Sequence, residues 1–237
     1  MGMILHNDTL CIIAHITGVQ VIEVIEEEAE NPYNDPINFL MTADELYEAF
    51  GNKEIGGIGS MTLADDSSYV TFTGSGDGKS EAILNVFTNP GNVSTGQYIV
   101  LKYRINSTNS VGDYFHFYTS TVLATVSGAN YLQHWIPNSE RDDNWHVLVL
   151  DASSILPDAF VTKNDKYFAT HLRFDIFNMS RPETDRIDIA YIGFSDSIED
   201  ICALNPDMET LKLCTKSDKP NSNTVQYIQV KTGEITD

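Results

Sequence analysis

Cysteine is scarce in this chain, and its few copies lie far apart. The 237 residues include three cysteines, Cys11, Cys202 and Cys214. No two of them form a CxxC pair, so the sequence has neither a disulfide framework nor the spacing of a zinc or thiol redox site. The cysteines therefore leave the cellular compartment open.

Basic residues are few as well, and they form no cluster. The chain has 14 Lys and Arg against 34 Asp and Glu, which gives a formal net charge of -20. A surface of this charge repels the phosphates of nucleic acids and the headgroups of anionic lipids. We therefore expect no nucleic-acid partner and no role at a membrane surface.

Long hydrophobic runs are missing. The apolar stretch at residues 10–16 follows no basic segment, and Gln20 and Glu23 interrupt what comes after it. A membrane-spanning helix needs about 20 apolar residues, and a signal peptide begins with basic ones. We expect no membrane insertion and no signal peptide within this sequence. A longer precursor with a cleaved signal stays open.

Signatures of catalysis are also lacking. The chain has no GxSxG, no HExxH and no cysteine nucleophile motif. Gly74 and Gly78 are one residue too close for a phosphate-binding loop. Glu183 and Asp188 approach the acidic spacing of sandwich-fold glycoside hydrolases, but Glu183 follows Pro182 in an expected turn and Asp188 is one methylene short. We expect that the protein is not an enzyme.

What the chain does have is enough apolar material for a core. Hydrophobic residues make up 42% and charged residues 20%, a composition typical of folded rather than disordered chains. A single domain of this length buries roughly 70% of the surface of its unfolded chain.

The main pattern is a series of short segments rich in Val, Ile, Thr, Tyr and Phe, separated by Gly, Asn, Asp and Ser. Along residues 99–105, odd-numbered residues are apolar or aromatic and share one face, as expected for a strand with one buried side. Strands without helical periodicity between them favour an antiparallel sandwich. We expect strands near residues 58–63, 68–73, 81–87, 97–106, 113–119, 145–151, 169–177 and 186–194.

Turn-forming residues divide the chain. The Asn- and Pro-rich segment 31–36 cannot continue a strand. We therefore expect an N-terminal strand extension and linker at 1–37, a β-sandwich at 38–200 and a C-terminal extension at 201–237. The last extension has a strand at 224–230, which pairs with the N-terminal strands or begins a further domain. Capping signals predict short helices at 42–50 and 197–204.

Four segments carry a resemblance to a known family: 96–104 (GQYIVLKYR), 144–151 (NWHVLVLD), 172–178 (LRFDIFN) and 187–194 (IDIAYIGF). They resemble strands of galactose-binding-like jelly-roll domains, the β-sandwiches of many carbohydrate-binding modules in bacterial surface and secreted proteins and in phage fibres. The resemblance implies an all-β fold, an antiparallel jelly-roll β-sandwich with short peripheral helices and strand extensions at both termini. It is suggestive for the ligand only, because a fold does not fix a function.

Aromatic and polar residues supply candidate ligand contacts. Sugar recognition needs flat aromatic rings together with donors and acceptors for hydroxyl groups. The alternation at 114–118 puts Phe115 and Phe117 on one face of a strand, and the three residues between and beside them on the other face. Further candidates lie on the expected strand at 169–177 and in an expected loop that contains Trp135. The candidates are Tyr114, His116, Tyr118, Trp135, His171 and Arg173. Two alternatives stay open: strand tyrosines that are covered by a loop, and a site at loop tips around Trp135 and Asp142.

A metal site is a second expectation. Modules of the resembled type often hold one structural calcium ion through an aspartate of the last strand, and Asp188 is the matching position. Acidic turns at 65–66, 77 and 142–144 offer further oxygen ligands. No turn has the spacing of an EF-hand loop, so the alternative is that these aspartates form turns.

The sequence thus predicts a non-catalytic carbohydrate-binding module for surface attachment, with a glycan as its ligand. The alternative is a structural or adhesive virion component, such as a phage fibre or capsid decoration protein, with homo-oligomer or neighbouring virion subunits as partners. Both functions place the protein outside the cell, at a cell surface or at a virion surface.

Overall fold

The computed structural model describes residues 2–6, 9–13, 39–51, 58–76, 82–87, 97–106, 114–120, 131–151, 161–163, 166–168, 171–177, 182–216 and 223–237. The chain forms two compact units, Met1–Asp35 and Pro36–Asp237. In the first unit, β1 (Gly2–His6) pairs with β2 (Thr9–Ile13) as an antiparallel hairpin. The second unit contains the sandwich.

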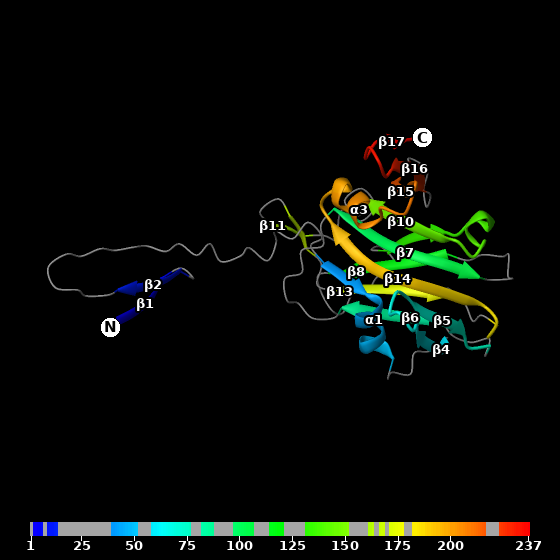
Figure 1. Cartoon of the computed structure of the whole chain (residues 1–237), viewed down its shortest axis with the longest axis horizontal. Helices are drawn as coiled ribbons and strands as arrows, with labels where there is room; N and C mark the ends of the chain where they lie inside the picture. Colours follow the sequence, from blue (N-terminus) through cyan, green and yellow to red (C-terminus); the bar gives the residue numbers. More distant parts are fainter. Residues whose placement is uncertain are drawn as a thin grey trace. The chain divides into compact units, whose positions relative to one another are not determined.

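The larger sheet of the second unit contains nine strands. Their order across the sheet is β17 (Ile235–Thr236), β16 (Asn223–Gln229), β15 (Thr210–Lys216), β10 (Trp145–Asp151), β7 (Tyr98–Asn106), β14 (Arg186–Ser195), β5 (Val70–Gly74) and β4 (Ile58–Leu63), with β3 (Phe39–Thr42) paired to the second half of β14. Figure 1 shows β7 and β14 side by side in the middle of this sheet. The pairing of β10 with β15 is parallel, whereas the other pairings described in the sheet are antiparallel.

The smaller sheet has four antiparallel strands. Their order is β6 (Ala82–Phe87), β13 (His171–Phe177), β8 (Tyr114–Ser120) and β9 (Tyr131–Trp135). A separate hairpin joins β11 (Val161–Lys163) to β12 (Lys166–Phe168). The chain moves back and forth between the layers, because β5, β7, β10 and β14 lie in the larger sheet while β6, β8 and β13 lie in the smaller one. The all-β sandwich and its eight expected strands are confirmed.

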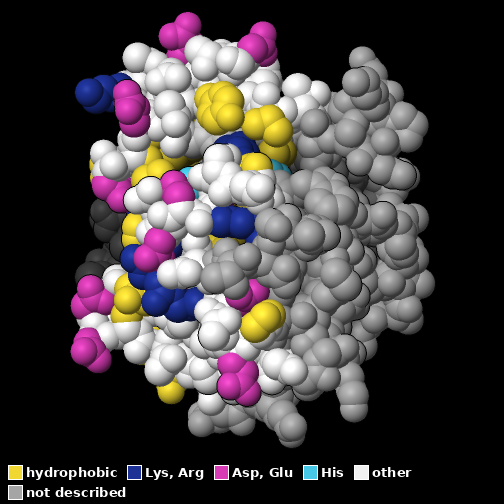
Figure 2. Space-filling view, turned by 90° about the vertical axis from the view of Figure 1, so that its right-hand side faces the viewer, with side chains coloured by type: hydrophobic (Ala, Val, Ile, Leu, Met, Phe, Trp, Pro, Cys, Tyr) yellow, Lys and Arg dark blue, Asp and Glu magenta, His cyan; other side chains and the backbone are white. Residues whose placement is uncertain are grey.

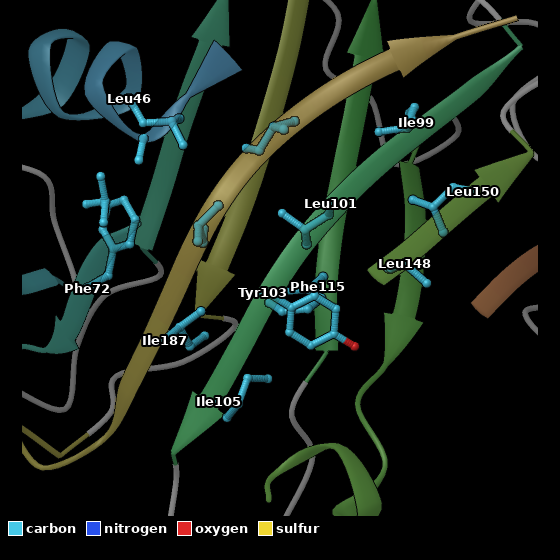
Figure 3. Packing of buried hydrophobic residues seen from close by; sticks show 14 of the residues in the cluster. Leu46, Phe72, Ile99, Leu101, Tyr103, Ile105, Phe115, Leu148, Leu150 and Ile187 are labelled. Carbon is cyan, nitrogen blue, oxygen red and sulfur yellow. The ribbon is translucent and has the colours of Figure 1, made fainter. Parts of the chain in front are cut away.

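The main hydrophobic core lies between the two sheets. Tyr103 of β7 meets Phe115 of β8 edge to face, with ring centroids 5.0 Å apart. Figure 3 shows these two rings beside Leu101 and Leu148, with Phe72 and Leu46 at the other end of the cluster. Each large apolar side chain buried in this way contributes about 1.5–3 kcal/mol. The core therefore fixes Phe115 on the inner face of the smaller sheet.

A second cluster covers the opposite face of the larger sheet. Here α3 (Ile198–Leu204) buries Ile201 and Cys202 in a cluster that also contains Val147 and Val149 of β10. The helix begins as expected, since the Ser197 side chain accepts a hydrogen bond of 3.2 Å from the Asp200 backbone amide. The larger sheet is thus buried on both faces near β10 and β15.

The other expected helix is α1 (Ala43–Phe50), which packs Leu46 and Phe50 into the main core. Its capping box is present, because the Thr42 backbone amide donates to the Glu45 carboxylate at 2.8 Å. Neither α1 nor α3, the α-helices of the described residues, has the length and apolar character of a membrane span.

The structure also has strands that the sequence did not predict, and two of them matter for the candidate sites. Residues 131–135 form β9, although the sequence suggested a loop at Trp135. Residues 210–216 form β15, which inserts between β10 and β16. The C-terminal strands therefore extend the larger sheet, with β16 between β15 and β17.

Candidate functional site

The residues predicted to bind ligand lie on three adjacent strands of the smaller sheet: Tyr114, His116 and Tyr118 on β8, Trp135 on β9, and His171 and Arg173 on β13. Tyr114 stands opposite Trp135 in the strand register. Tyr118 stands opposite Arg173 on its other side. Strand pairing thus brings together residues that are far apart in the sequence.

These residues share one face of the smaller sheet. Successive residues of a strand lie on opposite faces, and directly paired residues lie on the same face. Phe115 is buried against the larger sheet, so Tyr114, His116 and Tyr118 lie on the face turned away from it. Their partners Trp135 and Arg173 belong to that same face. At the six predicted positions the structure describes the backbone alone.

Asp188, the predicted calcium ligand, lies within the larger sheet, and its side chain is 1% exposed. Its Oδ2 accepts hydrogen bonds from Arg104 Nε at 2.8 Å and Nη2 at 2.6 Å, and its Oδ1 accepts one from Thr71 Oγ1 at 2.7 Å. A guanidinium therefore occupies the side where calcium needs further oxygen ligands. In the described part of the chain, no three His, Cys, Asp or Glu side chains are placed to hold a metal. This arrangement fits an arginine rather than a calcium ion, and the calcium prediction remains untested.

Arg104 is enclosed by aromatic rings. Its guanidinium carbon lies 5.0 Å from the centroid of Tyr69 and 4.8 Å from that of Trp145, within cation–π range. Burial alone lowers the pKa of Arg104, but hydrogen bonds and the charge of Asp188 raise it above its usual value. Trp145 is half-buried and lies over this ion pair.

The acidic turns behave as turn formers. Asp66 accepts a hydrogen bond from the Ser68 amide at 3.0 Å, and Asp142 accepts one from the Asn144 amide at 3.0 Å. Partial burial alone raises the pKa of Asp142, but its hydrogen bonds to Asn144 and His146 lower it to about 2. Asp77 lies outside the described residues.

A pocket opens between η1 (Asn138–Glu140) and strands β15 and β16, with a volume of about 480 Å³. Polar residues on its wall include Ser139, Glu140, His146, Thr210 and Lys212; apolar or aromatic ones include Pro137, Met208, Val225 and Tyr227. Figure 2 shows hydrophobic side chains beside a basic one on the upper part of the face in view. The pocket is thus lined by both apolar and polar side chains, which is typical of small-molecule sites.

Two of the polar lining residues, Glu140 and Lys212, form a largely buried ion pair. Glu140 is 3% exposed, and one of its carboxylate oxygens forms an ion pair with the Lys212 ammonium. The other oxygen accepts a hydrogen bond of 2.5 Å from the Tyr103 hydroxyl. Burial lowers the pKa of Lys212 although the nearby Cys214 opposes this effect.

His134 lies behind the ion pair. Its Nε2 is 3.7 Å from the Glu140 carboxylate, and its Nδ1 is 3.5 Å from the Cys214 sulfur. A cysteine, a histidine and a carboxylate in this order resemble a nucleophile with its base. Burial raises the pKa of Cys214 to about 12 and lowers that of His134 to about 3. At neutral pH the thiol therefore stays protonated and is a poor nucleophile.

The pocket was missed at the level of sequence. Glu140, Lys212 and Cys214 belong to no motif, and they meet only because β15 pairs in parallel with β10. One signal was available: residues 131–135 (YLQHW) contain two aromatic residues, a residue type that is enriched in strands. It would have placed His134 and Trp135 on opposite faces.

Comparisons with known proteins give a coarse result. No family model and no curated protein matches the chain. A solved exo-1,3/1,4-β-glucanase from a Pseudoalteromonas species is similar over 59% of this chain and 17% of its own, with 14% sequence identity and a TM-score of 0.33. The matched part therefore spans about a sixth of that enzyme, and a likeness this weak carries no argument about function.

Proposed function

We propose that the protein is a non-catalytic carbohydrate-binding module that attaches its bearer to a surface glycan. The observation that carries the proposal is the strand register of the smaller sheet, which puts Tyr114 next to Trp135 and Tyr118 next to Arg173 on one face. Aromatic rings suit the C–H faces of sugars, and Arg and His suit their hydroxyls. The all-β sandwich supports the proposal as a scaffold.

A glycan array followed by titration calorimetry tests this proposal. We expect binding to one glycan class, and we expect Trp135→Ala and Tyr118→Ala each to weaken it about tenfold or more, because a stacked ring contributes about 1–3 kcal/mol. Ile235→Ala is the matched control, since Ile235 is 45% exposed and lies on β17 of the other sheet. Absence of any glycan signal with folded protein would contradict the proposal.

The same variants locate the site. If Trp135→Ala abolishes binding while Tyr114→Ala and Tyr118→Ala leave it intact, the ligand lies at the edge of the sandwich near Trp135 and Asp142. If all three weaken binding, the face of the smaller sheet is the site. Thermal unfolding of each variant shows whether a loss of binding reflects a loss of folding.

A virion component is the second candidate function. Its supporting observation is the C-terminal edge of the larger sheet, where Val225, Tyr227 and Ile235 are the large hydrophobic side chains exposed in the described residues. An exposed sheet edge of this kind is a surface for pairing with another subunit. Light scattering distinguishes the candidates: an obligate trimer without a glycan signal supports the virion component, and a monomer that binds glycan supports the module.

A further inference from the structure

The Glu140–Lys212 pair stands on the inner face of the larger sheet, where an apolar pair is expected. Leu148, the partner of Lys212 on β10, and Cys214, two residues further along β15, belong to the main core. Removing both charges of a buried ion pair in favour of apolar residues is often neutral or stabilising. Folding therefore does not account for this pair. Its position on the wall of the pocket offers another role.

The pair presents a donor and an acceptor side by side. Glu140 uses one oxygen for Lys212 and the other for Tyr103, but each carboxylate oxygen has two lone pairs and the ammonium has three hydrogens. A hydroxyl group can donate to the carboxylate while its neighbour accepts from the ammonium. Vicinal hydroxyl groups match this arrangement without changing the charge of either residue.

Charge favours a neutral ligand. An anionic ligand at Lys212 would compete with Glu140 and would approach a chain whose net charge is -20. A cationic ligand at Glu140 would displace Lys212 and leave its ammonium unpaired in a buried place. A neutral polyol leaves the ion pair intact.

The rim of the pocket supplies an aromatic surface. Tyr227 is 42% exposed and stands opposite Lys212 in the register of β15 and β16. Val225, two residues earlier on the same strand, is 41% exposed. An exposed tyrosine ring next to a donor and acceptor pair is suited to the C–H face of a sugar ring.

We propose that this pocket binds a single neutral sugar ring, with Tyr227 against its C–H face and the Glu140–Lys212 pair on two adjacent hydroxyl groups. The inference rests on the proposed function for its ligand class. It adds a second site that is separate from the face of the smaller sheet. That face suits a longer chain of sugars, whereas the pocket suits the ring at the end of a chain.

The test is a titration of the ¹⁵N-labelled protein with methyl β-D-glucopyranoside, methyl β-D-galactopyranoside and methyl α-D-mannopyranoside. We expect at least one of them to shift the backbone amide signals of residues 139–140 and 210–212, with millimolar affinity. Tyr227→Ala should weaken this binding about tenfold or more. Ser139→Trp, at an exposed position on the pocket wall, should block it.

Two controls keep the test specific. Ile235→Ala removes another exposed side chain from the C-terminal strands, outside the pocket wall, and should leave the affinity unchanged. Tyr118→Ala changes the other proposed site and should also leave it unchanged. Binding that survives both Tyr227→Ala and Ser139→Trp overturns the pocket proposal.

The outcomes separate this inference from the proposed function. Glycan binding that depends on Trp135 or Tyr118, with no methyl glycoside at the pocket, overturns the inference and leaves the module standing. Pocket binding without any effect of the smaller-sheet variants supports the inference and overturns the site on that sheet. Absence of binding at both places overturns both.

Discussion

Two buried carboxylates in this sandwich have similar partners and different surroundings. The side chain of Asp188 is 1% exposed and that of Glu140 is 4% exposed. Asp188 is paired with Arg104 at 2.6 Å and, more distantly, with Arg186 at 3.5 Å, whereas Glu140 is paired with Lys212. Arg104 holds Asp188 under a cover of Tyr69 and Trp145. Lys212 holds Glu140 at the wall of a pocket. The Glu140–Lys212 pair therefore differs from the Asp188 pair in that it lines a cavity.

The two pairs also differ in the number of donors. Asp188 accepts three hydrogen bonds, two from the planar guanidinium of Arg104 and one from Thr71. A bidentate arginine fixes both the distance and the orientation of its partner. Lys212 is a point charge with freely rotating hydrogens, so the pair at Glu140 can add a ligand hydroxyl without losing its own contact.

Removing the basic partner should show the largest difference between the pairs. We expect Arg104→Met to lower the free energy of unfolding by about 3–5 kcal/mol, because it leaves Asp188 buried with too few donors. We expect Lys212→Met to cost less, about 1–3 kcal/mol, because water in the pocket can reach Glu140. Urea unfolding measures both. Equal losses would break the comparison.

The double variants serve as controls for these losses. Arg104→Met with Asp188→Leu, and Lys212→Met with Glu140→Leu, remove both charges of each pair. Each double variant should regain most of the stability that the single variant loses. A double variant that is as unstable as its single variant would show that packing, rather than an unpaired charge, causes the loss.

Titration of His134 should affect only the pair at Glu140. The pKa of His134 is lowered to about 3 in the folded state by burial and by the charge of Lys212, against about 6.5 in the unfolded chain. Between these two pKa values the unfolded state binds one proton more than the folded state. The contribution of the neutral His134 to stability is therefore fully present above about pH 6.5 and is lost as the pH falls toward 3. The expected slope is about 1.4 kcal/mol per pH unit.

Comparison of the native chain with His134→Gln isolates this effect. The pH window from 4 to 6.5 lies above the unfolded pKa of aspartate, about 3.9, so the lowered pKa of Asp142 contributes little within it. Urea unfolding at several pH values in that window should give a smaller slope for the variant. Equal slopes would mean that His134 is protonated in the folded protein.

The fold was largely predictable because its signals are local. Alternation along residues 99–105 predicts a strand with one buried face, and Ile99, Leu101, Tyr103 and Ile105 are indeed in the main core. The capping residues Thr42 and Ser197 predict where the helices begin, and each makes or anchors the expected hydrogen bond. Patterns of this kind depend on a few neighbouring residues.

The ion pairs were not predictable in the same way. Arg104 and Asp188 meet because β7 pairs with β14, and Glu140 reaches Lys212 because β15 joins the sheet in parallel to β10. These pairings depend on the packing of whole strands, so the paired residues have no characteristic spacing that marks them in the sequence. The candidate residues on the smaller sheet were named from their chemistry, and only the register shows which of them are adjacent.

The hydroxyl of Tyr103 should have a moderate effect. Tyr103→Phe keeps the ring that packs on Phe115 but removes the hydrogen bond to Glu140. We expect a loss of about 1–2 kcal/mol in the free energy of unfolding, as for a buried acceptor that loses a donor. In the variant Lys212→Met the same substitution should cost more, because Glu140 then loses both the Lys212 ammonium and the Tyr103 hydroxyl. Additive losses in a double-mutant cycle would show that the two contacts are independent.

Tyr227→Ala should have the smallest effect on folding. It contrasts the rim of the pocket at Glu140 with the aromatic cover of the Arg104–Asp188 pair. Tyr227 is 42% exposed at the rim of the pocket, so its removal should change the free energy of unfolding by no more than about 0.5 kcal/mol. Trp145→Ala, in contrast, removes a half-buried ring over Arg104 and should cost more than 1 kcal/mol, about the value of a partly desolvated cation–π contact and its packing. Chemical unfolding of the two variants tests this ranking. If Tyr227→Ala proves the more costly, the ring supports the sheet edge, and a weaker affinity for sugar in that variant would no longer identify it as a ligand contact.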